Sequence, residues 1–115
     1  KLLARSEKAK TGSNGAWQPM VRQHPDTGCA ALYLNPMRCD AVERMGEAEG
    51  DTLLDTLYRH CDQPEFQYSH GWSKGDMLIW DNRSCLHQAT PVRVASERRY
   101  MHRIMLRGDK PIMAV

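Results

Sequence analysis

The stretch "AWQPMVRQHPDTGCAALYLN", residues 16–35, contains two segments typical of β-strands on either side of the turn-forming run "HPDTG". Pro25 suits the first central position of a turn because its ring fixes φ, and Gly28 accommodates the positive φ that closes many hairpins. The pattern therefore predicts a β-hairpin over residues 17–35.

The apolar spacing changes after this hairpin. Apolar side chains now recur three and four residues apart, which is the spacing of one helical face. They are Leu53, Leu54, Leu57, Tyr58 and Cys61. In residues 40–61, Gly46 and Gly50 interrupt the earlier part of the apolar pattern. We therefore predict a short turn near residues 40–45 and a helix over residues 48–61.

Beyond the helix, side chains return to the alternating pattern of strands. Four segments show it: "EFQYSHGW", "DMLIW", "CLHQA" and "RYMHRIMLR". The predicted connections are "SKGD", "DNRS" and residues 91–97. Asp81, Asn82 and Arg83 are expected to fix the second of these turns. Many short strands with one helix predict a mainly β, α+β fold, an antiparallel jelly roll that carries a helical insertion.

Composition and charge exclude several classes of protein. With 115 residues and 41% hydrophobic side chains, the chain has the size of one domain or part of one. Its formal net charge of +2 is too small to indicate nucleic-acid binding, and its apolar runs are too short for a membrane span or secretion signal. The four cysteines form no C-x-x-C pair, which favours a reducing, cytoplasmic setting.

The first residues have a different character from the rest. Residues 1–16, "KLLARSEKAKTGSNGA", are polar, basic and rich in small side chains. We predict a flexible surface loop here. Because the first residue is Lys1 rather than Met, we also expect the sequence to start within a longer chain.

The last predicted strand carries an unusual set of cations. Successive side chains of a strand alternate between its faces, so Arg99 and Arg103 point the same way. At roughly 3.3 Å per residue they stand about 13 Å apart, enough to hold the outer ends of two small anions. A guanidinium suits carboxylate, sulfonate or phosphate groups, and a histidine such as His87 can bind a metal or carry a proton. Each residue also has an ordinary explanation, as a packed strand histidine or a solvated cation.

Four segments, in order, carry a family resemblance: "VRQHPDTGCAALYLNP", "LLDTLYRHCDQPEFQYSHGWSKGDMLIWDNR", "CLHQAT" and "RRYMHRIMLRGDKP". Over about residues 17–112 the chain resembles the taurine dioxygenase family of iron(II)- and 2-oxoglutarate-dependent oxygenases. The resemblance implies a double-stranded β-helix, the jelly roll named above. Residues 17–115 would form the C-terminal part of this oxygenase domain.

The resemblance also implies roles for three residues. His87 matches a histidine of the 2-His-1-carboxylate set that binds iron(II). Arg99 matches the residue that grips the far carboxylate of the cosubstrate 2-oxoglutarate, and Arg103 matches the residue that holds the anionic group of the substrate. The implied reaction uses O2 to hydroxylate a small anionic substrate (a sulfonate, sulfate ester or aryloxy carboxylate) and converts 2-oxoglutarate to succinate and CO2.

The chain departs from the family pattern because it lacks the upstream H-x-D pair that supplies the other metal ligands. His24 and Asp26 have this spacing, but they lie in the predicted hairpin turn, which matches a scaffold segment of the family. We therefore expect residues 1–115 alone to bind iron(II) weakly, to be inactive and to fold poorly. A second interpretation is a noncatalytic β-rich module that binds anions or protein partners. The oligomeric state stays open, with a homo-oligomer among the options.

Overall fold

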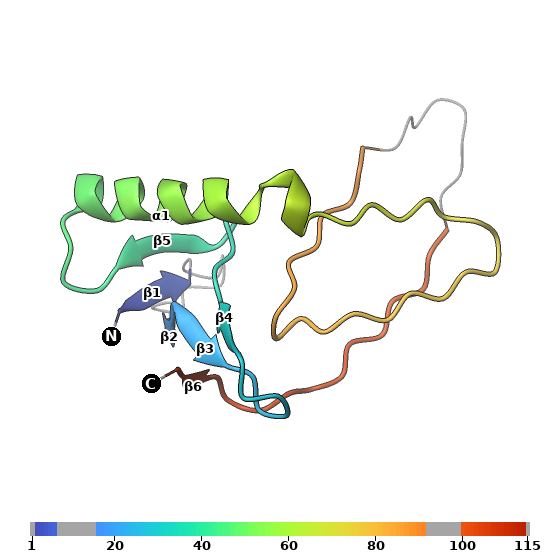
Figure 1. The fold of residues 1–115 in the computed structure, drawn as a ribbon, viewed down its shortest axis with the longest axis horizontal. Helices are drawn as coiled ribbons and strands as arrows, with labels where there is room; N and C mark the ends of the chain where they lie inside the picture. The colour runs from blue at the N-terminus through green and yellow to red at the C-terminus, as the bar shows by residue number, and fades with distance from the viewer. Residues whose placement is uncertain (1, 7–15, 92–99, 115) are drawn as a thin grey trace.

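The computed structural model describes residues 2–6, 16–91 and 100–114 (Figure 1). Within these residues the chain forms two three-stranded sheets, one α-helix and one short 3-10 helix. The strands are β1 (Leu3–Ser6), β2 (Ala16–Pro19), β3 (Val21–Gln23), β4 (Ala30–Leu32), β5 (Cys39–Val42) and β6 (Ile112–Met113), and the helices are α1 (Glu47–Cys61) and η1 (Pro64–Phe66). In the part of the chain that is described, no helix is long and apolar enough to cross a membrane.

The predicted hairpin is present as the antiparallel pair of β3 and β4. Its turn is closed by a hydrogen bond of 2.8 Å from the amide of His24 to the carbonyl of Cys29. Gly28 adopts the predicted positive φ, at 73°. Strand β6 pairs with the other edge of β3, which gives a sheet of order β4-β3-β6 with β3 at its centre.

The first strand of the predicted hairpin, residues 16–23, is divided between two sheets. β2 ends at Pro19 and pairs with β1, whereas β3 pairs with β4 and β6. Pro19 has no amide hydrogen to donate to a ladder, and the next side chain, Met20, is only 3% exposed. The amide of Met20 donates to the carbonyl of Leu2, and its carbonyl accepts the amide of Tyr33. The single continuous strand was therefore a wrong prediction, because a buried residue follows the proline.

The prediction of a flexible loop over residues 1–16 is wrong for residues 3–6, which form β1. This strand is the centre of the second sheet, of order β2-β1-β5, and pairs antiparallel with both neighbours. Ala4 belongs to the core, with 2% of its surface exposed. Ladder hydrogen bonds along both edges thus hold a segment whose composition suggested a loop. Residues 7–15 of the predicted loop lie outside the described residues.

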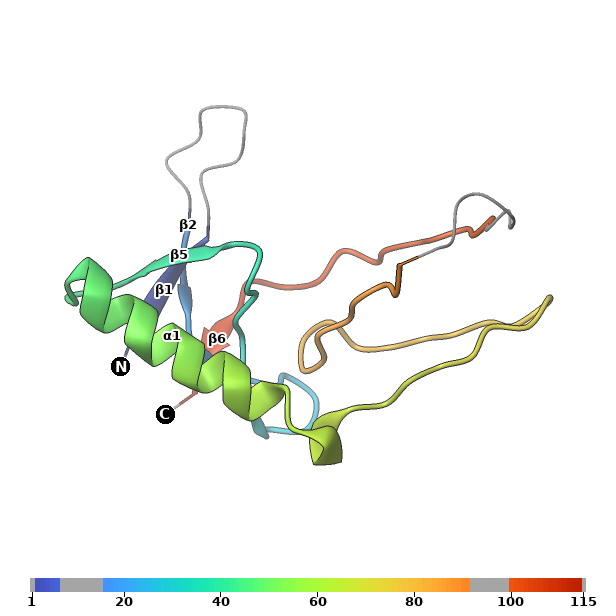
Figure 2. The ribbon, with the colours of Figure 1, turned by 90° about the horizontal axis from the view of Figure 1, so that it is seen from above.

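The predicted helix is confirmed as α1, which begins one residue earlier than expected. Acidic side chains occupy its first turn and basic ones its last, the arrangement that the helix dipole favours: Glu47, Glu49, Arg59 and His60. Leu54 is buried in the core, and Gly50, which lies within the predicted helix, is buried against Val42. Figure 2 shows α1 lying alongside the strands, and its Leu54 belongs to the same core cluster as Ala4 and Met20.

The four strands predicted after the helix do not form in the described residues. Over residues 67–91 and 100–111 the chain joins neither sheet, and it runs away from the packed elements before it returns to β6 (Figures 1 and 2). Two of the three predicted connections are present as turns, at residues 74–75 and 82–84, and the third, residues 91–97, lies outside the described residues from residue 92 onward. A strand is stabilised by ladder hydrogen bonds to a neighbour, and these segments have no neighbouring strand in the described chain. Alternation of side chains was therefore not sufficient to form them.

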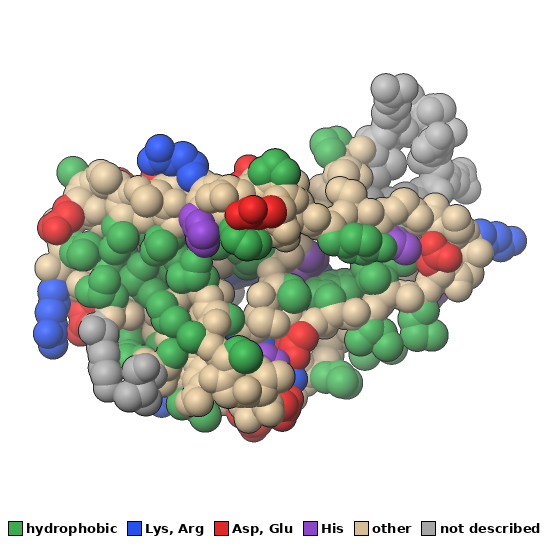
Figure 3. Space-filling model, viewed as in Figure 1, with side chains coloured by type: hydrophobic (Ala, Val, Ile, Leu, Met, Phe, Trp, Pro, Cys, Tyr) green, Lys and Arg blue, Asp and Glu red, His purple; other side chains and the backbone are tan. Residues whose placement is uncertain are grey.

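Large apolar side chains remain exposed in these extended segments (Figure 3). Ile79, Ile104 and Leu106 are 86%, 88% and 93% exposed, respectively. Apolar residues also line an open hollow of about 550 Å³ between α1 and the β4-β3-β6 sheet, among them Leu32, Leu53, Leu57 and Met113. The described elements thus leave a large apolar surface in contact with water. Single exposed apolar residues are normal on a protein surface, but an area of this size is not.

Candidate functional site

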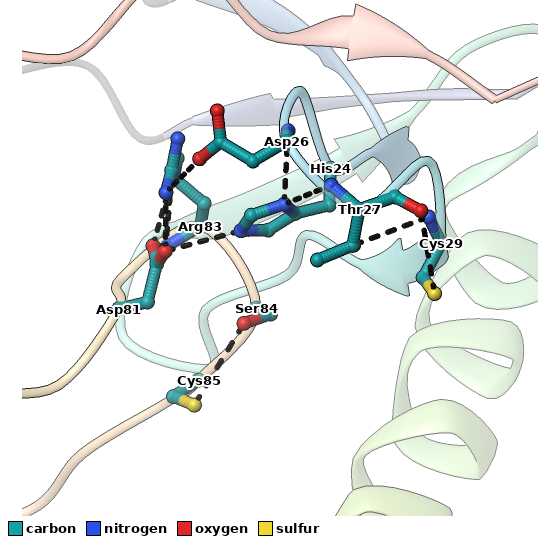
Figure 4. A network of polar contacts seen from close by, with 8 residues as sticks. All are labelled: His24, Asp26, Thr27, Cys29, Asp81, Arg83, Ser84 and Cys85. Carbon is teal, nitrogen blue, oxygen red and sulfur yellow. Dashed lines mark hydrogen bonds and ion pairs between the residues drawn. The ribbon is translucent and has the colours of Figure 1, made fainter.

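His24 lies at the end of β3 and is almost buried, with 8% of its surface exposed. Its Nδ1 accepts hydrogen bonds from the backbone amides of Asp26 (3.3 Å) and Thr27 (3.2 Å). A nitrogen that accepts two such bonds carries no proton, so the proton of the neutral ring belongs on Nε2. That N–H donates to the Oδ2 atom of Asp81 at 3.0 Å (Figure 4). The two ring nitrogens of His24 are thus both engaged.

Arg83 adds a cation to this network and bonds to two carboxylates. Its Nε and Nη2 atoms donate to the carboxylate of Asp81 at 2.9 and 2.6 Å, and Nη2 also lies 2.7 Å from the Oδ2 atom of Asp26 (Figure 4). Hydrogen bonds from the Arg83 side chain, and then from His24, hold the pKa of Asp81 well below its usual range. The same bond to Asp81, followed by that to Asp26, raises the pKa of Arg83. Both groups are therefore ionised at neutral pH.

This network joins two turns that are far apart in the sequence. His24 and Asp81 are separated by 57 positions. In the second turn, the carbonyl of Asp81 accepts the amides of Ser84 (3.2 Å) and Cys85 (2.9 Å), and its side chain accepts the amide of Arg83 at 2.8 Å. These bonds confirm that Asp81 and Arg83 fix this turn, as predicted.

His87 follows this turn and is exposed. Its ring lies 4.8 Å from the ring of Trp80, centroid to centroid, with 54° between the two planes. Among the described residues its ring nitrogens make no hydrogen bond, so an imidazole nitrogen of His87 can serve as a metal ligand. However, the described part of the chain contains no group of three His, Cys, Asp or Glu residues that could hold a metal ion. His87 could therefore act as one ligand of a metal site, but the described residues do not bring the other ligands of such a site together.

Only one of the two arginines of the predicted anion sites lies among the described residues. Arg99 lies outside the described residues, so its predicted role stays a prediction. Arg103 is exposed, and its Nη2 atom donates to the sulfur of Met105 at 3.2 Å. Residues 100–107 do not form a strand. Because Arg99 lies outside the described residues, the strand face predicted to be shared by Arg99 and Arg103 stays a prediction.

Two polar features of the structure were not predicted from the sequence. The first is the bond between His24 and Asp81, because the hairpin turn was expected to serve only as scaffold. Asp26 does lie in that turn, as predicted, but its carboxylate also pairs with Arg83. The second is Arg22, which is 5% exposed and lies over the ring of Tyr33 at 4.9 Å, while its Nε has no hydrogen-bond partner among the described residues. No local pattern signals either feature.

Comparison with known proteins settles the family. A family model described as "Taurine catabolism dioxygenase TauD, TfdA family" matches residues 4–105. The chain belongs to this family. The resemblance that the sequence motifs indicated is thereby confirmed. TauD, TfdA family membership rests on most of the chain rather than on one motif.

Curated relatives are similar to the chain over part of their own length. The (S)-phenoxypropionate/alpha-ketoglutarate-dioxygenase of Sphingobium herbicidovorans is 37% identical over 92 residues, which cover 80% of this chain and 31% of that protein. The alpha-ketoglutarate-dependent 2,4-dichlorophenoxyacetate dioxygenase of Cupriavidus pinatubonensis is 38% identical over 80 residues, 70% of this chain and 28% of the relative. The chain thus spans less than a third of the length of either relative.

Solved structures of similar proteins agree on the fold. A taurine dioxygenase from Burkholderia xenovorans matches with a TM-score of 0.67 and 30% identity, over 72% of this chain and 29% of that one. The structure of AAD-2 in complex with Mn(II) and N-oxalylglycine matches with a TM-score of 0.66 and 29% identity, over 73% and 39% of the two chains. This TauD, TfdA family chain therefore shares its arrangement of small sheets with one helix with both solved structures.

Proposed function

We propose that the protein containing these residues is an iron(II)- and 2-oxoglutarate-dependent dioxygenase that hydroxylates a small anionic substrate. The observation that carries this proposal is the family match over residues 4–105, with relatives named as alpha-ketoglutarate-dependent dioxygenases. On this proposal, residues 17–115 are the C-terminal part of a jelly-roll oxygenase domain. The remaining strands of the domain would pair with the extended segments described above.

His87 is the metal ligand that this chain contributes. Its ring nitrogens are unengaged among the described residues, and Trp80 packs against its ring, which restricts the orientation of the imidazole. A 2-His-1-carboxylate site requires two further protein ligands, which the rest of the domain would provide. When bound, iron(II) and 2-oxoglutarate would allow O2 to act as the oxidant, with one oxygen atom going to succinate, which forms with CO2, and the other to the hydroxylated substrate.

Arg99 and Arg103 are assigned to the two anions. We assign Arg99 to the far carboxylate of 2-oxoglutarate because of its position in the motif "RRYMHR". Arg103 is assigned to the substrate anion. Its exposed guanidinium bonds to a thioether sulfur, which is a weak acceptor, so most of its donors remain available for a carboxylate or sulfonate.

Among the three candidate substrate classes, the names of the relatives favour aryloxy carboxylates. Two of them are named for phenoxypropionate and for 2,4-dichlorophenoxyacetate. Another relative, from Schizosaccharomyces pombe, is named as a putative sulfonate dioxygenase and is 31% identical over 94 residues. Sulfonates and sulfate esters therefore remain in the proposed class.

Succinate formation by the full-length protein tests the proposal. The assay contains iron(II), 2-oxoglutarate and O2, with 2,4-dichlorophenoxyacetate, taurine or an alkyl sulfate as substrate. We expect one anionic substrate to stimulate succinate formation, and the matched alcohol of that substrate, which lacks the anionic group, to do so far less. Anion binding without any succinate formation would instead support the noncatalytic module.

A further inference from the structure

We propose that the turn clamp, formed by His24, Asp26, Asp81 and Arg83, is a positioning device for His87. The inference rests on the proposed function, because it assigns the clamp to the metal ligand of that site. It goes further by giving a role to a hairpin turn that was expected to serve only as scaffold. The Asp81 turn is connected to three parts of the chain: the segment that carries His87, the ring of Trp80, and the β4-β3-β6 sheet.

The clamp holds the start of the segment that carries His87. The carbonyl of Asp81 accepts the amides of Ser84 and Cys85, so the hydrogen-bonded turn ends two residues before His87. Residues 86–91 then have no sheet partner among the described residues. The direction in which this segment leaves the packed elements is therefore set at its near end, by the position of Asp81.

The ring beside His87 is tied to the same turn. The indole N–H of Trp80 donates to the side-chain oxygen of Asn82 at 2.8 Å, and the Trp80 ring lies 4.8 Å from the His87 ring. The turn thus positions both the backbone that leads to His87 and the Trp80 ring that packs against its imidazole. A shift of the turn would move both together.

His24 links this turn to a sheet. It directly follows β3, the central strand of the β4-β3-β6 sheet, and its side chain is 10% exposed. Because Nδ1 accepts the two amides of its own turn, Nε2–H is directed to Asp81 at 3.0 Å. The bond of 2.7 Å between Arg83 and Asp26 forms a second bridge between the two turns. Two side-chain bridges therefore hold the turn before His87 in a fixed position relative to the sheet.

A second histidine–aspartate pair in the chain has the same chemistry without this connection. His70 Nε2 lies 3.2 Å from the Oδ2 atom of Asp76, and the two side chains are 25% and 33% exposed. These partners are only six positions apart, and Asp76 also accepts the amide of Ser73 within the same turn. The pair fixes one local turn and reaches no sheet. It is the matched control for the clamp.

Two amide substitutions separate the functions of the two ring nitrogens of His24. In His24→Asn the amide oxygen can replace Nδ1 as the acceptor of the turn amides, but the side chain is too short to reach Asp81. In His24→Gln the amide N–H can replace Nε2–H and keep the bridge. Asp76→Asn weakens the control pair. Each variant is made in the full-length protein, and iron(II) affinity is measured by anaerobic titration calorimetry beside urea unfolding.

We expect His24→Asn to weaken iron(II) binding by about tenfold or more, the range seen when groups that orient metal ligands are removed. His24→Gln should bind iron(II) nearly as tightly as the wild type, and Asp76→Asn should leave iron(II) affinity unchanged. Rescue by glutamine would identify the bridge, rather than general loss of stability, as the cause. Asp26→Asn, at a side chain that is 69% exposed, should weaken binding by about threefold.

Unchanged iron(II) affinity in His24→Asn would overturn the inference, and so would an equal loss in Asp76→Asn. If His24→Asn does not fold, the exposed Asp26→Asn decides: a weakened affinity supports the clamp and an unchanged one overturns it. A wild-type protein that binds no iron(II) would overturn the proposed function, and the inference with it. Wild-type binding that is insensitive to the clamp would overturn the inference alone.

Discussion

The packed part of the chain (residues 2–6, 16–66 and 112–114) and the extended part (residues 67–91 and 100–111) use similar side chains with opposite results. In the packed part, Leu54 and Val42 are each 4% exposed between α1 and β5. In the extended part, Ile79 is 86% exposed and no sheet forms. The difference lies in available partners rather than in composition, because apolar burial requires a second surface.

The residues that we assign to binding and the residues that hold them in place also lie in different parts of the chain. His87 and Arg103, which we assign to the metal and the substrate, lie in the extended part. The packed part reaches this segment through His24 and Asp26, which bond to Asp81 and Arg83. Outside the turn clamp, substitutions of core residues in the packed part should therefore act mainly on stability, and substitutions of His87 and Arg103 mainly on binding. The following predictions test this division, beginning with the largest expected effect.

Leu54→Ala should lower the free energy of unfolding by about 3 kcal/mol, because it removes a buried side chain and leaves a cavity between α1 and β5. Urea unfolding of the full-length protein measures this loss. Iron(II) affinity of the folded fraction should stay close to that of the wild type. A Leu54→Ala variant with full stability would show that the packed part does not form the stable core of the protein.

Arg99→Ala should weaken 2-oxoglutarate binding by more than about tenfold, because the bidentate bond to the far carboxylate is lost. Arg99→Lys should restore the affinity only in part, since an ammonium lacks the planar fork of the guanidinium. Equilibrium titration of the full-length protein with 2-oxoglutarate gives both values. Arg98→Ala, at the adjacent cation, is the matched control, and an equal loss there would remove the assignment of Arg99.

Arg103→Ala should raise the KM for the anionic substrate by about tenfold while iron(II) and 2-oxoglutarate affinities stay near those of the wild type. The reason is that Arg103 is assigned to the substrate anion alone. Succinate formation at varied substrate concentration gives the KM. A loss of 2-oxoglutarate affinity as large as that of Arg99→Ala would show that the two arginines have been given the wrong anions.

The clamp should make stability depend on acid. Because the pKa of Asp81 is lowered in the folded protein, its deprotonated form stabilises the fold above the ordinary carboxyl pKa of about 4. This contribution is lost as the pH falls through that value toward the lower pKa of the folded state. The difference in unfolding free energy between the wild type and Asp81→Asn, measured in urea, should therefore shrink as the pH falls. A difference that is constant with pH would contradict the lowered pKa.

Ile79→Ala tests whether the extended part is covered in the full-length protein. The Ile79 side chain is 86% exposed in residues 1–115, and substitution of a side chain that stays exposed costs within about 0.5 kcal/mol. The same substitution should cost about 2 kcal/mol if the extended part becomes a buried strand of a jelly roll. Urea unfolding of the full-length protein measures the cost, and a value within about 0.5 kcal/mol would argue against the predicted strand.

Local patterns correctly predicted the elements whose stability is largely local. The three- and four-residue spacing located α1 because a helix satisfies its own backbone hydrogen bonds within one segment. Pro25 and Gly28 located the turn of the hairpin because each constrains or permits particular φ values. The motifs around His87 and Arg103 likewise indicated the family. These predictions needed no knowledge of what lies beside each segment.

Other features depended on partners that are distant in the sequence. Composition suggested a loop for β1, yet two flanking strands made residues 3–6 the centre of a sheet. Alternation suggested four strands between residues 65 and 107, yet in the described part of these residues no ladder forms because no neighbouring strand is present. A strand differs from a helix in this respect, since its hydrogen bonds are all made to another segment.

Motifs alone therefore determined the turn chemistry, the helix and the candidate ligand and anion-binding residues. Only the tertiary structure decided that the chain passes from one sheet to the other at Met20. It also decided that His24 bonds to Asp81, which is 57 positions away in the sequence. A bond of this kind depends on where the ends of β3 and of the Asp81 turn lie in space. Neither residue's neighbours in the sequence carry that information, so the support of His87 became visible only in the folded chain.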